Sequence, residues 1–123
     1  MIQSETLALL EWERLCQHLS TFAETKLGAI AATQLLPPDT QAASLELLSQ
    51  TQEIEQIERS LDAGWKFTGI TDIREALTRA ELGGMLAGSE LLNLATTLAG
   101  VRRLRRVIAV SYTHLRAHET EAD

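Results

Sequence analysis

The chain has 123 residues and a net charge of −6, with 45% hydrophobic, 23% charged and 4% aromatic residues. This composition predicts one folded domain with an aliphatic core and excludes a disordered chain. Residues 1–90 hold six Lys and Arg against fourteen Asp and Glu, which argues against general nucleic-acid binding by that part. No apolar run approaches the ~20 residues of a membrane span, and the N-terminus lacks the pattern of a secretory signal. A single cysteine, Cys16, indicates a reducing, cytoplasmic location.

The first predicted helix covers residues 4–19. Its apolar residues recur at steps of three and four, which is typical of one buried helix face. They are Trp12, Leu15, Leu19 and Phe22. Cys16 adjoins this face, so a buried structural thiol is expected. A nucleophile–base pair with His18 is disfavoured, because residues two apart on a helix point in different directions.

The second predicted helix begins at Thr21. Thr21 and Glu24 have the spacing of a capping box, in which a hydroxyl and a carboxylate satisfy the first amides of a helix. The helix is expected to end before Pro37–Pro38, because proline lacks an amide hydrogen and restricts the residue before it.

A long third helix is predicted from Asp39 or Thr40 to about Ala63, with Gly64 as its stop. Apolar residues repeat every seven positions along it and form a seam typical of coiled coils. These residues are Leu47, Ile54 and Leu61. An acidic run on the same helix is interpreted as a solvated face rather than as a paired-carboxylate site. The run consists of Glu53, Glu55, Glu58 and Asp62.

Residues 65–69 are expected to connect this helix to a fourth, which begins at Thr71 or Asp72. Asp72 and Glu75 again have capping-box spacing. The buried face of the fourth helix is predicted to consist of Ile73, Leu77 and Ala80. Gly83–Gly84 is expected to end it, with the second glycine at positive φ. No Lys and hydroxyl follow this pair, so it is predicted to be a turn and not a phosphate-binding loop.

The fifth predicted helix begins near Ser89 and carries a long apolar stripe. The stripe consists of Leu91, Leu94, Leu98, Val101, Leu104 and Ile108. Four arginines crowd its last turns: Arg102, Arg103, Arg105 and Arg106. They are candidates for contact with nucleic-acid phosphate. The favoured alternative is that they pair with acids on neighbouring helices and with the negative end of the helix dipole. We expect part of the stripe to be exposed in this chain.

Residues 111–123 do not continue the stripe. Their sequence, SYTHLRAHETEAD, resembles a peptide that recurs where reading frames run into sequencing-adapter DNA. We therefore expect that the natural chain was cut near Val110 and that only the residues before this point are native. The alternative is an ordinary frayed terminus. His114 and His118 have helical spacing for zinc, but without a third ligand no metal site is predicted.

Together these patterns predict an all-α fold of about five helices in an irregular bundle, without a sheet. We expect residues 1–110 to form the helical part and residues 111–123 to be a tail that is not native. No catalytic, cofactor-binding or metal-binding residue is assigned.

Several segments, in order, resemble the MutS-II branch of the bacterial MutS proteins. They are LLEWERLC at 9–16, TKLG at 25–28, LLP at 35–37, ITDI at 70–73, RAELGGML at 79–86, ELL at 90–92, TL at 97–98 and RRL at 102–104. Each motif alone is weak, but their order and spacing over residues 1–110 are specific.

The resemblance implies a helical core-and-lever segment, which relays nucleotide state to a clamp. It implies that the remaining domains of the parent protein supply an ABC-type ATPase and an Smr nuclease, with ATP and Mg as cofactors. The implied parent is a cytoplasmic homodimer that binds branched DNA or the rRNA of stalled ribosomes, without a membrane partner. Two alternatives from the residues stay open: a stand-alone dimerisation module built on the Leu47–Ile54–Leu61 seam, and a small nucleic-acid binder that uses residues 102–106.

Overall fold

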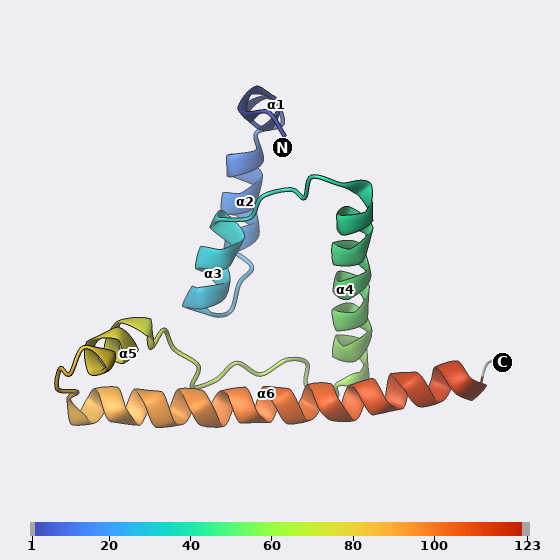
Figure 1. Ribbon diagram of the computed structural model, residues 1–123. Coiled ribbons are helices and arrows are strands. Elements are labelled where there is room, and N and C mark those ends of the chain that lie inside the picture. Colours follow the sequence, from blue (N-terminus) through green and yellow to red (C-terminus); the bar gives the residue numbers. More distant parts are fainter. Residues whose placement is uncertain (1, 122–123) are drawn as a thin grey trace. The chain divides into compact units, whose positions relative to one another are not determined.

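The computed structural model describes residues 2–121, except for the side chains at 114, 115 and 118–121. The described residues form six helices and no strand (Figure 1). The helices are α1 Ser4–Leu9, α2 Trp12–Ser20, α3 Lys26–Thr33, α4 Gln41–Ser60, α5 Arg74–Glu81 and α6 Gly88–Glu121. This confirms the predicted all-α class, although the number of helices is six rather than five.

The chain divides into two compact units, residues 1–53 and 54–123, and α4 contributes to both. The first unit holds α1, α2, α3 and the first part of α4. The second unit holds the end of α4, the connector that follows it, α5 and α6.

The predicted first helix is broken in two at Leu10–Glu11. Glu11 adopts a left-handed conformation with φ 49°, and the α-helical path resumes when the amide of Leu15 donates to the carbonyl of Glu11. A non-glycine residue rarely adopts positive φ. The prediction of a single helix over residues 4–19 is therefore wrong. The apolar spacing of these residues is uninterrupted and does not indicate the break.

The core of the first unit lies where α2 packs on α3, at Cys16 and Ala32. Cys16 is 3% exposed, which confirms the predicted buried thiol. Its Sγ donates to the carbonyl oxygen of Leu35 over 3.6 Å, and Trp12 Nε1 donates to the same oxygen over 2.8 Å. The predicted neighbours in this core, Leu15 and Leu19, are instead exposed.

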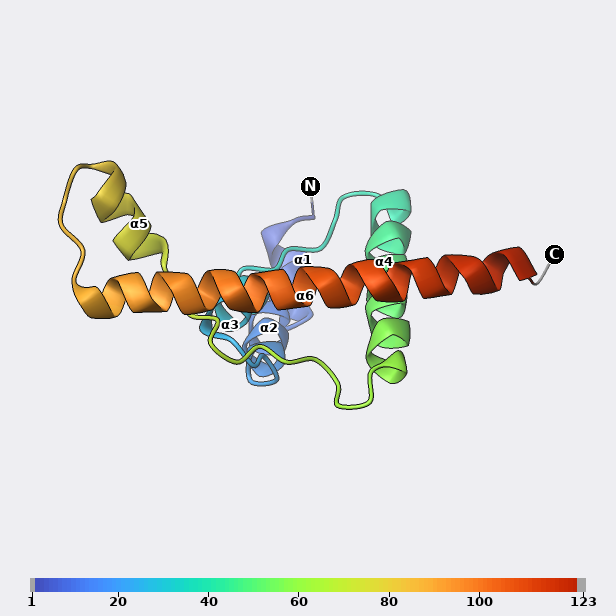
Figure 2. The same cartoon turned by 90° about the horizontal axis from the view of Figure 1, so that it is seen from below.

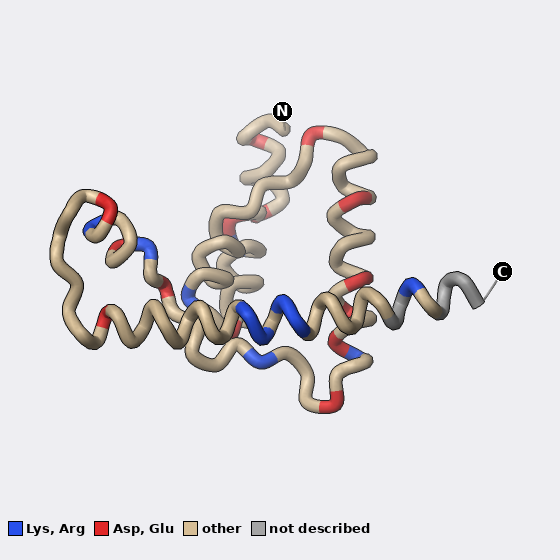
Figure 3. Tube along the Cα trace, turned by 60° about the horizontal axis from the view of Figure 1, so that its bottom comes forward, with Lys and Arg blue, Asp and Glu red and all other residues tan. Residues whose placement is uncertain are grey.

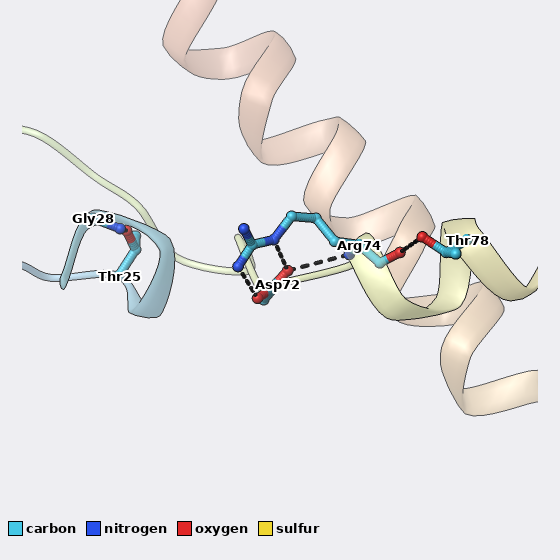
Figure 4. Close-up of polar contacts among 5 residues, drawn as sticks. All are labelled: Thr25, Gly28, Asp72, Arg74 and Thr78. Atoms are coloured by element: carbon cyan, nitrogen blue, oxygen red, sulfur yellow. Dashed lines mark hydrogen bonds and ion pairs between the residues drawn. The ribbon is translucent and has the colours of Figure 1, made fainter. Parts of the chain in front are cut away.

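The cap of the second predicted helix is four residues later than expected. The amide of Gly28 donates to Thr25 Oγ1 over 3.0 Å, so Thr25 is the N-cap of α3 (Figure 4). Thr21 instead follows α2, and its hydroxyl donates to the carbonyl of His18 over 2.7 Å. Each threonine could supply a capping hydroxyl. Because α2 continues to Ser20, Thr21 lies at the end of that helix and Thr25 caps the next one. At the start of α4, Thr40 Oγ1 accepts a hydrogen bond from the amide of Ala43 over 3.2 Å. Thr40 is one of the two residues predicted to cap this helix.

In the second unit, the connector follows α6 from the end of α4 to α5. Figures 1 and 2 show this path from two directions, with α5 beside the first turns of α6. Gly64 has φ 65° and lies in the turn that leaves α4, as its predicted role as a helix stop requires. The last helical residue is Ser60, three residues earlier than expected.

The turn between α5 and α6 differs from the prediction in detail. Gly83, not Gly84, has positive φ, at 82°. Gly84 is needed for space, because a Cβ there would lie 2.9 Å from the carbonyl oxygen of Arg79. Helix α5 begins at Arg74, two residues after the predicted cap Asp72. Of its predicted buried face, Leu77 and Ala80 are exposed and Ile73 is half-buried.

Helix α6 begins one residue before the predicted Ser89 and continues to Glu121. It therefore passes through most of residues 111–123, where no continuation was predicted. The prediction that these residues are foreign to the native protein concerns their origin, and it stays a prediction.

Candidate functional site

The connector is fixed to α6 by a hydrogen-bond network around Thr97. Thr97 is 5% exposed, and its hydroxyl donates to the carbonyl of Gly69 over 3.3 Å. The same oxygen accepts from the amide of Thr71 over 3.2 Å and lies 3.2 Å from the Thr71 hydroxyl. A buried hydroxyl with these three contacts is fully satisfied, so Thr97 stabilises one position of the connector on the helix.

Two further contacts extend this attachment along α6. Arg103 Nη2 donates to the carbonyl oxygen of Thr68 over 2.7 Å. Gly100 is buried under Ile70, and a Cβ at Gly100 would lie only 2.7 Å from Ile70 Cγ1. The glycine thus allows close approach of the connector, and we refer to Thr97, Gly100 and Arg103 as the connector site.

An ion pair holds α5 to the start of α6. Arg79 Nη1 lies 2.6 Å from Glu90 Oε1, and Glu90 Oε2 accepts from the amide of Ala87 over 2.7 Å. Glu90 therefore caps the first turn of α6 and at the same time pairs with Arg79 of α5. The Ala87 amide, and then Arg79, lower the pKa of Glu90 below the ordinary carboxyl value. The hydrogen bond to Glu90 raises the pKa of Arg79.

Asp72 forms a second pair with Arg74 at the start of α5 (Figure 4). Its carboxylate accepts from Arg74 Nε over 2.9 Å, from Arg74 Nη2 over 2.7 Å and from the Arg74 amide over 3.2 Å. The hydrogen bonds to Asp72 raise the pKa of Arg74. Because the fork of the guanidinium is already used, this pair stabilises the helix start and is no reactive site.

The four clustered arginines of α6 are all exposed, and Figure 3 shows the blue turns near the middle of that helix in which they lie. They are Arg102, Arg103, Arg105 and Arg106. Arg103 binds the connector, as described. Among the described residues, none of Arg102, Arg105 and Arg106 forms an ion pair with an acid. The favoured alternative, pairing with acids of neighbouring helices, is therefore not seen in this part of the chain. Phosphate contact by the cluster stays a prediction.

The predicted apolar stripe of α6 is largely exposed. Leu98 is 58% and Val101 48% exposed, while the buried positions among the described side chains of the helix are Thr97, Gly100 and Ser111. This confirms the expectation that part of the stripe lacks a covering neighbour. The connector covers a different face of the helix, which polar Thr97 and small Gly100 make possible. Sequence reasoning missed this face because neither residue is apolar and large.

The other predicted chemical candidates give no reactive site. Glu53, Glu55 and Glu58 are exposed on α4, and Glu55 pairs with Arg59. No group of three His, Cys, Asp or Glu residues that could hold a metal ion occurs among the described residues. The candidate pair of His114 and His118 lies outside the described side chains.

Among the described residues, each unit carries a hollow. In the first unit a groove of about 1030 Å³ lies between α1, α2 and residues 33–36, beside the half-buried Trp12. In the second unit a smaller hollow of about 250 Å³ lies between residues 61–66 and α6, beside Arg103. Trp65 borders this hollow, but its Nε1 is buried and unpartnered and has no access to a ligand.

Comparison with known proteins identifies relatives of the chain. It is 64% identical over 107 residues, or 87% of its length, to the Endonuclease MutS2 of Synechocystis sp.. It is 33% identical over 103 residues to proteins of the same name from Bacillus thuringiensis and Bacillus cereus. The chain belongs to the MutS2 family. The resemblance that its motifs indicated is therefore confirmed.

This MutS2 chain spans 13% of the length of the curated relatives it matches. It matches no protein-family model and no solved structure. None of the helices within the described residues is long and apolar enough to cross a membrane.

Proposed function

We propose that this chain is the N-terminal core-and-lever segment of a MutS2 protein and acts as a mechanical part without catalysis of its own. The 64% identity to the Synechocystis Endonuclease MutS2 carries this proposal. Residues 1–110 would be the functional part, and residues 111–123 would not belong to the native protein. The small share of the relatives' length that the chain spans agrees with a segment rather than a whole enzyme.

The structure supports a mechanical role through its attachments. The connector site fixes residues 68–71 to α6, and the Arg79–Glu90 pair fixes α5 to the same helix. A long helix attached at two places transmits a displacement along its axis with little bending, as a lever requires. The parent's ATPase would drive this lever, and a clamp would receive its motion.

The parent protein would be a cytoplasmic, homodimeric ATPase and endonuclease. It would suppress recombination at branched DNA, bind DNA in a manner like mismatch repair, or rescue stalled ribosomes through rRNA contacts. We place the binding of ATP and Mg outside this chain, because its glycine pair is not followed by the Lys and hydroxyl of a phosphate-binding loop. The one glycine pair has the amide of Gly84 bonded to the carbonyl of Arg79 over 2.8 Å, so that amide is not free for a phosphate.

Recovery of the intact gene from its source tests the proposal. We expect the reading frame beyond codon 110 to differ from residues 111–123 and to encode a phosphate-binding loop with Lys and a hydroxyl further on. A stop codon directly after the present sequence in the intact gene would contradict the proposal.

A stand-alone dimerisation module is the second candidate, favoured by the exposure of Leu47 and Ile54 on α4, each 47%. A gene that ends with this chain, together with a stable dimer, would support it.

A nucleic-acid binder that uses Arg102, Arg103, Arg105 and Arg106 is the third candidate. Its affinity would fall steeply with salt and would be lost when all four arginines are replaced by Ala. Unchanged affinity in that variant would exclude it.

A further inference from the structure

The junction between α1 and α2 is strained, and packing does not lock it. Glu11 has φ 49° and ψ 39°, a left-handed conformation that costs free energy for a residue with a side chain. Such a conformation persists where the surrounding structure fixes it. Leu9 and Leu10 are 86% and 63% exposed, and the Glu11 side chain is 67% exposed. Residues 9–11 therefore lack the packing that would hold them in one conformation.

The side chain of Glu11 also gives the break little support. Glu11 is the N-cap of α2, but its side chain accepts no hydrogen bond from the first amides of that helix. Its carboxylate instead lies 3.4 Å from Arg14, whose side chain is 80% exposed. Exposed pairs of this kind contribute little to stability. The break thus leaves the start of α2 without a side-chain cap.

An unbroken helix through the junction would add hydrogen bonds. The amides of Leu10 and Leu15 already donate to carbonyls four residues earlier, as in an α-helix. Straightening would let the amides of residues 12–14 donate to the carbonyls of residues 8–10. Residues 4–20 contain neither Gly nor Pro, so the sequence favours this continuous helix.

The kinked α1 forms one wall of the groove in the first unit. Figure 1 shows α1 turned away from the axis of α2. Leu7 and Ala8 of α1 line the groove together with residues 33–36. Leu7 is half-buried there, and this burial stabilises the kink. Trp12 Nε1 donates to the carbonyl oxygen of Leu35 over 2.8 Å, which fixes α2 to the other wall.

We propose that Glu11 is a hinge, at which α1 moves between the kinked arrangement and a continuous helix with α2. The burial of Leu7 favours the first arrangement, and the added backbone hydrogen bonds favour the second, so the chain populates both. Helix α1 is then a movable wall of the groove, while the bond between Trp12 and Leu35 stays in place. The proposal concerns the first unit alone and does not depend on the function proposed for the parent protein.

Distances between two spin labels measure the hinge in the full chain. The labels are attached at Glu5→Cys on α1 and Ala31→Cys on α3, which are exposed and do not line the groove, while buried Cys16 is retained. We expect a major kinked and a minor straight population. Glu11→Gly should lower the straight share about tenfold, because glycine adopts positive φ freely and disfavours a helix. Glu11→Val should raise it several-fold, because a β-branched residue rarely adopts positive φ.

Glu13→Val is the matched control, since it makes the same exchange within α2 and should leave the two populations unchanged. Identical distance distributions in the wild type and both Glu11 variants would overturn the proposal. A shift of both Glu11 variants in the same direction would overturn it as well.

Amide exchange measured by NMR tests the hinge without labels. The amides of residues 12–14 are bonded to α1 only in the continuous helix, whereas those of residues 15–20 lie within α2 in both arrangements. We expect Glu11→Val to raise the protection of residues 12–14 about twofold relative to residues 15–20, and Glu13→Val not to. A variant that only loses stability lowers the protection of both sets and leaves their ratio unchanged. An unchanged ratio in Glu11→Val would overturn the proposal.

Discussion

The hydroxyl oxygen of Thr97 lies 3.2 Å from the hydroxyl oxygen of Thr71, across 26 residues of sequence. The same Thr97 oxygen accepts from the Thr71 amide, and the Thr97 hydroxyl donates to the Gly69 carbonyl. This polar contact and the close packing of Ile70 on Gly100 together hold the connector on α6.

Thr97→Val should loosen the connector. The substitution keeps the shape of the side chain but leaves the Thr71 amide without its acceptor, and a hydrogen bond of this kind contributes about 0.5–1.5 kcal/mol to stability. Urea denaturation measures the change in the free energy of unfolding. Thr97→Ser keeps the hydroxyl and is the control, for which we expect a smaller loss. Equal stability of the valine variant and the wild type would contradict the role given to this hydroxyl.

Gly100→Ala should destabilise the chain even though alanine favours a helix. The gain in helix propensity is about 1 kcal/mol, whereas the new Cβ would lie 2.7 Å from Ile70 Cγ1, an overpacking that typically costs about 1–3 kcal/mol. Gly88→Ala is the matched control, because no atom lies within 4 Å of a Cβ at that position. The thermal midpoint should fall for Gly100→Ala and should not fall for Gly88→Ala. A rise for both would mean that the connector moves aside freely.

Glu90 should make the stability depend on pH in the acid range. The Ala87 amide and Arg79 lower its pKa in the folded chain, so its contribution is complete above the ordinary carboxyl pKa of about 4.3 and is lost as the pH falls through the folded value. Urea midpoints between about pH 2 and 6 measure this loss. Glu90→Gln should be less stable than the wild type at neutral pH, and the difference should shrink towards low pH. A constant difference would contradict the assignment.

Helix α6 should exchange its backbone amides readily in the isolated chain. Its apolar stripe is largely exposed, and burying one Leu side chain fully contributes roughly 1.5–3 kcal/mol, whereas a small domain has only about 5–15 kcal/mol in total. Hydrogen exchange followed by mass spectrometry measures the exchange rates of these backbone amides. Strong protection throughout residues 91–108 would contradict the view that this helix lacks its covering neighbours.

Much of the fold follows from local signals in the sequence. Gly64 and Pro37–Pro38 end helices or keep them from continuing, and the acid Glu90 lies in the first turn of α6, as expected from the helix dipole. These features depend on residues within one turn of each other, so the sequence alone predicts them.

The remaining features depend on contacts between distant residues. Thr21 has the spacing of a cap, but α2 continues to Ser20 and uses Thr21 at its own end, so the next helix is capped by Thr25 instead. The connector site was missed for a similar reason. Thr97 and Gly100 are ordinary residues within a helix, and their importance arises only where Gly69 and Ile70 come within contact distance.

Exchange of a segment within a full-length relative tests the central claim most directly. The part of the Synechocystis Endonuclease MutS2 that matches this chain is replaced by the corresponding residues of this chain, and DNA cleavage is measured for the chimera and for this chain alone. We expect the chimera to cleave DNA, Gly100→Ala to reduce its activity, and the isolated chain to show neither cleavage nor nucleotide hydrolysis. Cleavage or hydrolysis by the purified chain alone would contradict the account of a passive helical segment.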